Sequence, residues 1–103
     1  LFSQKKLEEA RDLYIKAIEL DASRAGRFFS LGQILYELED MEDALRNFRR
    51  AVEMDPSNLD YLLTLAHFYV DKNMIAEAKH LVGEILLVFP DNEEAKKMEQ
   101  GLI

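Results

Sequence analysis

The 103-residue sequence contains no cysteine and no tryptophan, only two prolines and four glycines, and no long apolar run. Without cysteine the chain can form no disulfide and use no thiolate, and the redox compartment stays undecided. The most apolar stretch, residues 85–89, ends at Pro90. It is far shorter than the roughly 18 residues that a membrane-spanning helix needs. The sequence therefore predicts neither a transmembrane segment nor a membrane partner.

Positive charge is also scarce. Lysine and arginine total 13 against 20 aspartates and glutamates, which gives a formal net charge of −7. Binding to nucleic acid requires a concentrated basic surface that neutralises phosphates and releases counterions. Here the basic residues form only short pairs with acidic neighbours, such as Arg49-Arg50. We therefore expect no nucleic-acid partner and interpret these pairs as solvated helix faces.

The residues that catalysis or metal binding would need do not form a recognisable pattern. None of the glycines belongs to a nucleotide-binding fingerprint. His67 and His80 lie in different predicted helices, so a partner contact or solvation is favoured for His67, and a surface position for His80, over metal ligation. The acidic clusters lack the ligand spacing of a calcium loop. We predict that the chain is not an enzyme and holds no metal or cofactor.

What the sequence does contain is an internal repeat with a period of about 34 residues, a length typical of stacked helical repeats. Residues 28–56, FFSLGQILYELEDMEDALRNFRRAVEMDP, are matched in size and polarity by the segments before and after them. The small and apolar positions Ala44, Phe48, Ala51 and Pro56 correspond to Ala78, Val82, Ile85 and Pro90 one period later. In such an array each unit buries its apolar face against its neighbours.

The same residues carry a family resemblance. The repeat resembles a tetratricopeptide repeat, whose pattern is an aromatic, Leu-Gly, a Tyr, then Ala, an aromatic, Ala and a closing Pro. The matching positions are Phe28, Leu31, Gly32, Leu35, Ala44, Phe48, Ala51 and Pro56, with Leu35 where the family prefers Tyr. The resemblance implies an all-α, right-handed superhelical array of antiparallel helix pairs. It also implies a protein-binding scaffold, although a repeat fold names no ligand.

Apolar periodicity and capping residues place the elements. We expect helices at residues 7–20, 25–38, 41–54, 59–71, 75–88 and 93–103. By the repeat shift, Leu1 to Ser3 fall in the last turn of a preceding helix. Ser23 and Ser57-Asn58 are expected to cap the helices that follow them. The division is thus one domain, 1–103, with a partial repeat at 1–24, full repeats at 25–58 and 59–92, and a capping helix at 93–103.

The sequence also gives three packing expectations. Gly32 lies in mid-helix, where glycine costs about 1 kcal/mol relative to alanine, and we expect it to allow the two helices of its repeat to cross closely beside Phe48. Ile85 replaces the alanines of the earlier repeats and should hold the following helix farther away. The C-terminal helix is expected to cover part of the apolar patch formed by Leu87 and Phe89.

A stripe beside the buried face of each first helix is the candidate binding site. Its residues have the spacing i, i+4, i+7, which lies on one side of a helix. The predicted partner-binding residues are Phe2, Phe29, Gln33, Tyr36, Leu63, His67 and Val70. In proteins that this chain resembles, this face lines a concave groove for extended peptides or partner helices. The alternative interpretation is that these aromatic and apolar side chains pack against the neighbouring helix.

The chemistry of the partner follows from the flanking residues. Gly26, Glu37, Asp60 and Asp71 make the rim neutral to acidic, which favours an apolar protein or peptide of neutral or basic character. Co-chaperones that resemble this fold grip a C-terminal carboxylate with Lys, Asn and Arg. The corresponding places here hold Phe29, Gln33, Asp60 and Thr64. A carboxylate clamp is therefore not expected in these repeats, although a helix preceding residue 1 could carry part of one.

A second hypothesis is self-assembly. The helix at 7–20 lacks most of the helix that should cover it, so Leu7, Tyr14 and Ala17 are expected to be partly uncovered. A second copy of the chain could supply the missing layer and give a homo-oligomer. The compartment is left open, with the cytoplasm favoured.

Overall fold

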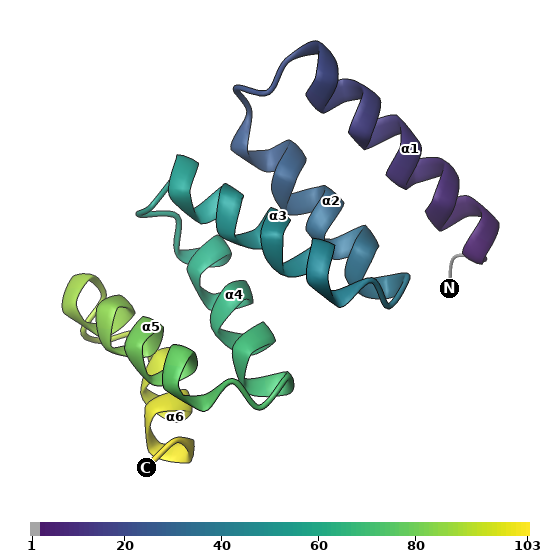
Figure 1. Ribbon diagram of the computed structural model, residues 1–103. Coiled ribbons are helices and arrows are strands. Elements are labelled where there is room, and N and C mark those ends of the chain that lie inside the picture. Colours follow the sequence, from purple (N-terminus) through teal and green to yellow (C-terminus); the bar gives the residue numbers. More distant parts are fainter. Residues whose placement is uncertain (1–2) are drawn as a thin grey trace. The chain divides into compact units, whose positions relative to one another are not determined.

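The computed structural model describes residues 3–103, and over this range the chain forms helices and no strand (Figure 1). The helices are α1 Gln4–Leu20, α2 Ala25–Glu37, α3 Met41–Met54, α4 Leu59–Asp71, α5 Ile75–Val88 and α6 Glu93–Gly101. The all-α prediction is confirmed, and α3, α4 and α5 have the predicted bounds. The chain divides into two compact units, Leu1–Pro56 with α1 to α3 and Ser57–Ile103 with α4 to α6.

The N-terminal helix begins earlier than predicted. Ser3 is the N-cap of α1, and its Oγ accepts a hydrogen bond from the backbone N–H of Lys6 at 3.3 Å. Because this hydroxyl satisfies an N–H of the first turn, the helix starts at Gln4, before the apolar stripe that opens at Leu7. The prediction that Ser3 ends a preceding helix is therefore wrong. Leu1 and Phe2 lie outside the described residues.

The connection from α1 to α2 also differs from the prediction. Ser23 does not cap α2, because its hydroxyl and its N–H both donate to Asp21 Oδ1, at 2.6 and 3.0 Å. The N-cap is Arg24, which makes no side-chain cap hydrogen bond. Instead, Arg27 Nη1 donates to the carbonyl oxygens of Ala17 at 2.8 Å and Asp21 at 3.0 Å. An arginine thus satisfies carbonyls at the end of α1 and ties α2 to it.

The turns within the two helix pairs α2/α3 and α4/α5 share one geometry. Glu39 and Asn73, which occupy the same position in successive repeats, have left-handed φ angles of 64° and 57°. Each follows a helix end closed by two backbone hydrogen bonds, such as Asp40 N to Leu35 O at 2.9 Å and Met74 N to Tyr69 O at 2.8 Å. This is the Schellman arrangement, which satisfies carbonyls that the helix leaves unpaired. The repeat is therefore also a repeat of backbone conformation.

Side-chain caps begin α3, α4 and α6, whereas Met74 begins α5 without one. Asp40 Oδ1 accepts from the N–H of Asp43 at 3.4 Å, and Asn58 Oδ1 accepts from that of Tyr61 at 3.1 Å. Asn92 caps α6 in the same way through the N–H of Ala95, at 2.9 Å. The predicted cap at Ser57-Asn58 is confirmed, with Asn58 as the capping residue. These caps fix where each helix starts and hence which face it turns inward.

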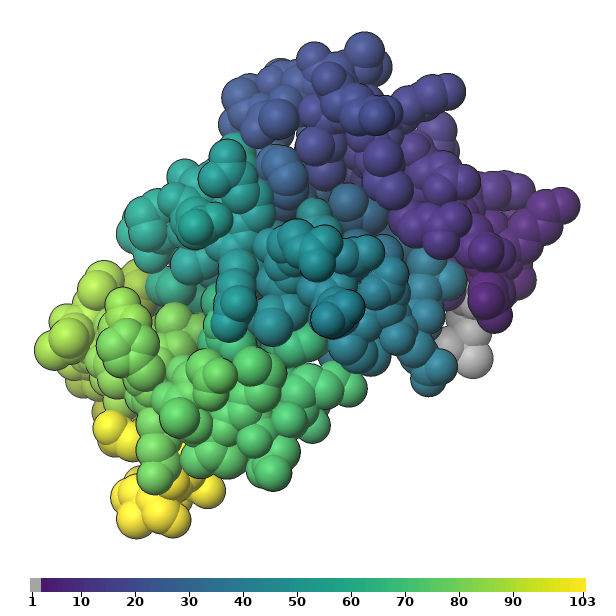
Figure 2. All heavy atoms as spheres, in the orientation of Figure 1, coloured from purple at the N-terminus to yellow at the C-terminus, as the bar shows by residue number. Residues whose placement is uncertain are grey.

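The core of the first unit lies between α2 and α3. A Cβ added to Gly32 would lie 2.7 Å from Phe48 Cδ1, closer than real contacts allow. The mid-helix glycine therefore makes room for the Phe48 ring, as expected. α1 packs on α2, but none of its residues is fully buried. Leu7, Tyr14 and Ala17 are only half-buried. Figure 2 shows the atoms of α1, in purple, lying open along one side of the first unit.

The core of the second unit is formed by α4, α5 and α6. Ala66, Val82, Ile85 and Ala95 are almost fully buried in it. Of the apolar patch that the C-terminal helix was predicted to cover in part, Leu87 is 84% exposed and Phe89 is half-buried. α6 packs on the face of α5 that carries Val82. Leu87 lies five residues farther along, about 140° around the helix at 3.6 residues per turn, and so points away from it.

Candidate functional site

The first part of the predicted stripe lies on α2. Leu31, Gly32 and Leu35 are buried, which leaves the adjacent face of the helix to Phe29, Gln33 and Tyr36. Among these three, Gln33 is exposed, whereas Phe29 and Tyr36 are half-buried.

Phe29 does more than line a surface. Its ring centroid is 5.8 Å from that of Phe48 on α3, with the planes tilted by 54°. Aromatic pairs at this distance and tilt stabilise a core beyond the area that they bury. At Phe29 the structure therefore favours the packing interpretation, and Gln33 is the most accessible position of this face.

The second part of the stripe lies on α4. Asn58 starts the helix, and the buried residues Leu62, Leu65, Ala66 and Tyr69 turn inward. The adjacent face presents Leu63, which is half-buried, with His67 exposed and Val70 38% exposed. This face is thus an apolar strip with one titratable side chain in its middle.

Glu94 is a member of this face that sequence analysis missed. Its Oε2 lies within hydrogen-bonding distance of His67 Nε2, and both side chains are about half exposed. Glu94 is in the first turn of α6, where the N-terminal end of a helix favours negative charge. The signal was available, because the repeat shift places Glu94 at the position of Asp60, a predicted rim residue. The structure therefore adds a carboxylate beside His67.

The other histidine is where the sequence placed it. His80 is exposed on α5, and its Nε2 lies 2.8 Å from Glu84 Oε1, one turn along the same helix. Within residues 3–103, no three His, Cys, Asp or Glu side chains lie close enough together to hold a metal ion. No helix in the described part of the chain is long and apolar enough to span a membrane.

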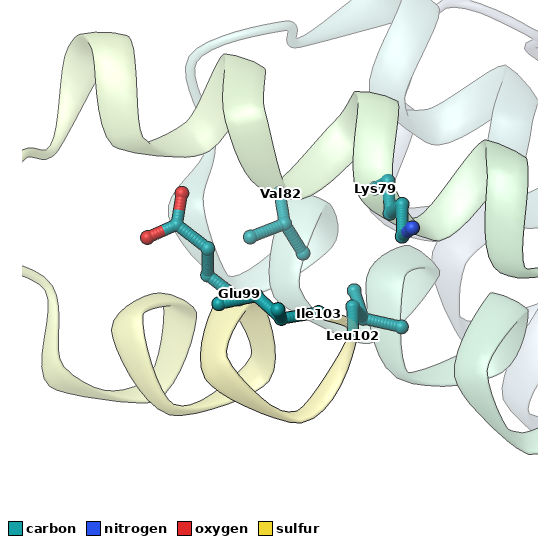
Figure 3. Close-up of a pocket in the computed structure, with 5 residues that line it drawn as sticks. All are labelled: Lys79, Val82, Glu99, Leu102 and Ile103. Atoms are coloured by element: carbon teal, nitrogen blue, oxygen red, sulfur yellow. The ribbon is translucent and has the colours of Figure 1, made fainter.

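A hollow of about 420 Å³ lies between α5 and α6 in the second unit (Figure 3). Val82 projects from α5 toward α6, with Lys79 and Glu99 lining the hollow and Leu102 and Ile103 contributing from the end of the chain. It is lined mainly by apolar surface and is open to solvent. The hollow marks where the packing of α6 on α5 is incomplete.

The seven predicted site residues therefore fall into three groups. Phe2 lies outside the described residues. Phe29, Gln33 and Tyr36 share a face of α2 in the first unit, and Leu63, His67 and Val70 share a face of α4 in the second. Each face is formed by its own helix.

Helix pairs that recur along the chain, with the same Schellman turns and small residues at the crossings, define a helical repeat protein. Comparison with known families agrees. Models of the tetratricopeptide repeat match residues 35–102 and residues 1–24. The chain belongs to the tetratricopeptide repeat family.

Individual proteins show the same relationship. Human RanBP2-like and GRIP domain-containing protein 4 is 36% identical over 93 residues, which cover 87% of this chain and 5% of that protein. The chain therefore spans only a small part of this relative's length.

Solved structures share the fold. The first tetratricopeptide repeat domain of Spaghetti (RPAP3), bound to the HSP90 peptide SRMEEVD, has a TM-score of 0.78 and 21% identity, covering 96% of this chain and 79% of that one. The second such domain of human RPAP3, in complex with the HSP70 peptide SGPTIEEVD, has a TM-score of 0.77 and 20% identity, covering 95% and 82%.

Proposed function

We propose that this chain is a protein-interaction module that binds a peptide or helix of a partner on an exposed helix face, that of α4 in the second unit and, separately, that of α2 in the first. Its family and the peptide complexes of similar structures support the proposal. The observation that carries it is the α4 face, where Val70 and Leu63 stay accessible beside the His67 and Glu94 pair. The proposal retains the division into a partial repeat at 1–24, full repeats at 25–58 and 59–92, and a capping helix at 93–103.

The partner is proposed to be apolar with neutral or basic residues. The peptides in the two similar structures end in acidic residues. On this chain, Asp60, Asp71 and Glu94 are exposed carboxylates on or beside α4. Like charges facing each other across an interface disfavour binding, whereas complementary charges favour it. A basic segment with one large apolar side chain therefore fits this face better than an acidic one.

The test compares two fluorescein-labelled peptides by fluorescence anisotropy at low salt. One is SRMEEVD, and the other has lysine in place of its acidic residues. The lysine peptide is expected to bind more tightly, and Val70→Lys is expected to weaken it by roughly tenfold, equivalent to about 1.4 kcal/mol.

The matched control is Ile15→Lys, which adds the same charge at a residue of similar exposure on α1. If the added charge acted only through general electrostatics, Val70→Lys and Ile15→Lys would lower the affinity for the lysine peptide equally. That result would refute the α4 face as the site. Tighter binding of SRMEEVD would refute the proposed partner chemistry.

A second candidate function is self-assembly through α1. No residue of this helix is fully buried, and Leu13 is 68% exposed. An open apolar helix face can pack against the same face of a second copy in a two-fold dimer. Multi-angle light scattering should then show a mass that rises with concentration and falls back for Leu13→Glu. A monomer at the highest soluble concentration would remove this candidate.

A further inference from the structure

The outward-facing surface of α5 differs from the same surface of α3. The two helices are one repeat period apart, so each position on one has a partner on the other. In α3 this surface holds Glu42, Arg46, Arg49 and Glu53, and in α5 the corresponding residues are Ala76, His80, Gly83 and Leu87. Three of the four charged residues on this surface of α3 are thus replaced by alanine, glycine or leucine on α5, and the fourth by histidine.

No packing contact among the described residues requires a glycine at position 83. Gly83 lies in mid-helix, where glycine is unfavourable compared with alanine. A Cβ added there would meet no atom within 4 Å, in contrast to Gly32, which the Phe48 ring requires. Glycine at an exposed helix position lets another backbone approach closely. The open space beside Gly83 would therefore admit the backbone of another helix.

Leu87 lies one turn from Gly83 on the same side of α5. The equivalent residues are Glu19 in α1 and Glu53 in α3, so in the other repeats this position holds a charged side chain that faces solvent. Here it is 84% exposed, and the adjacent Val88 is 63% exposed.

Beyond the end of the helix lies an open hollow of about 360 Å³ whose lining is polar and apolar in similar measure. Its lining residues are Val88, Phe89, Pro90, Asp91 and Asn92. Large apolar side chains gathered on a surface mark a place where another molecule binds.

The charges around this surface indicate what would bind. The exposed carboxylates Glu77, Glu84 and Asp91 flank it, and the lysines near them are Lys79 and Lys96, whose Nζ lies 3.9 Å from Asp91 Oδ1. His80 lies beside Glu84 at 2.8 Å. The rim is therefore acidic and complementary to a basic partner. A second copy of this chain, with 20 acidic against 13 basic residues, complements this acidic rim less well than a basic partner does.

We propose that the outer face of α5, defined by Ala76, His80, Gly83 and Leu87, is a docking surface for a basic amphipathic α-helix of a partner protein. The backbone of that helix approaches α5 over Gly83, and one of its large apolar side chains covers Leu87. Lysine or arginine on its flanks faces Glu84 and Asp91. This surface is distinct from the α2 and α4 faces, so the chain offers two separate partner sites.

A fluorescein-labelled amphipathic helical peptide of leucine and lysine is the probe, with a glutamate-for-lysine version as its counterpart. The lysine peptide is expected to bind and the glutamate peptide to fail. Leu87→Glu should weaken the lysine peptide about tenfold, which corresponds to losing much of one buried leucine contact. The substitution makes the chain more acidic, so general attraction alone would strengthen binding.

Leu13→Glu is the matched control, because it makes the same change at an exposed leucine of α1. It is measured at concentrations where the chain is monomeric. This variant should leave the affinity for the lysine peptide unchanged. A second variant, Gly83→Gln, fills the approach with a side chain that favours helix, so it should abolish binding while raising the thermal midpoint.

Amide chemical shifts should move at residues 76–91. Equal losses for Leu87→Glu and Leu13→Glu, shifts confined to residues 63–70, or no binding to the unaltered chain would each overturn the proposal.

Discussion

The helix pairs α2/α3 and α4/α5 have different residues at the equivalent positions of their crossings. In the first pair Gly32 gives its space to Phe48. In the second, the corresponding residues are Ala66 and Val82, so the first residue is larger and the second smaller. All four are buried. Protein interiors tolerate such exchanges when total volume is kept, so the repeat maintains a summed volume rather than particular side chains.

The outer faces of the second helices differ far more than the inner ones. On α3, Arg46 pairs with Asp43 and Arg50 with Glu53, in exposed ion pairs one turn apart. Such pairs contribute little to stability, typically well under about 1 kcal/mol each. α5 has Gly83 and Leu87 on the corresponding face. Because folding depends on the inner face, residues of the outer face can be substituted at little cost in stability. Such substitutions can create a binding surface.

The largest expected effect comes from making α5 resemble α3 at its buried face. Ile85 is fully buried, while α3 has Ala51 at this position. Ile85→Ala leaves a cavity and should lower the free energy of unfolding by about 2–5 kcal/mol, measured by urea denaturation. Leu87→Ala, at an exposed position of the same helix, should change it by less than about 0.5 kcal/mol. Similar losses for both would mean that Ile85 is not a core residue.

The next effect tests the exchange of volume at the crossing. Gly32→Ala forces a methyl group against the Phe48 ring, and overpacking of this kind costs about 1–3 kcal/mol. The gain of about 1 kcal/mol in helix propensity offsets only part of it. The double variant Gly32→Ala, Phe48→Val reproduces the Ala66 and Val82 arrangement and should regain part of the loss in thermal denaturation. A double variant less stable than either single one would contradict the volume argument.

A smaller effect of opposite sign is expected at the other mid-helix glycine. Gly83→Ala adds a methyl group into open space and should stabilise the chain by about 0.5–1 kcal/mol. Thermal denaturation beside Gly32→Ala measures the contrast directly. If both substitutions destabilised the chain, the space beside Gly83 would have to be filled.

The sequence predicted the inner faces well because their physics is periodic. Apolar spacing, the cap at Asn58 and the break at Pro56 placed α3, α4 and α5 at their observed bounds. The start of α1 after Ser3 and the identity of the residue that caps α2 were predicted wrongly, because each depends on a local competition. Ser3 could end one helix or begin another, and Ser23 could donate to Asp21 or cap α2. Hydrogen bonds that compete within a few residues leave no periodic signal.

The candidate site was predictable as a set of positions but not as contacts. Spacing indicated Leu63, His67 and Val70, yet whether Phe29 lines a surface or packs on Phe48 depends on rotamers that spacing does not encode. The approach of Glu94 to His67 joins two residues from different helices, far apart in sequence. The sequence did not indicate which part of the Leu87 and Phe89 patch stays exposed, because that depends on which face of α5 the C-terminal helix meets.

The smallest expected effect is a shift in the titration of Asp21. Hydrogen bonds from the hydroxyl and N–H of Ser23 hold the pKa of the Asp21 carboxyl below its ordinary value. A carboxyl whose pKa is depressed by folding stabilises the chain above its unfolded pKa, and this contribution is lost as pH falls through the lower, folded pKa. Ser23→Ala removes the hydroxyl, so the pKa should rise toward the ordinary range, as followed by NMR titration of the Asp21 carboxyl. An unchanged Asp21 titration in Ser23→Ala would show that Arg24 and Arg27, the other groups that lower this pKa, set it instead.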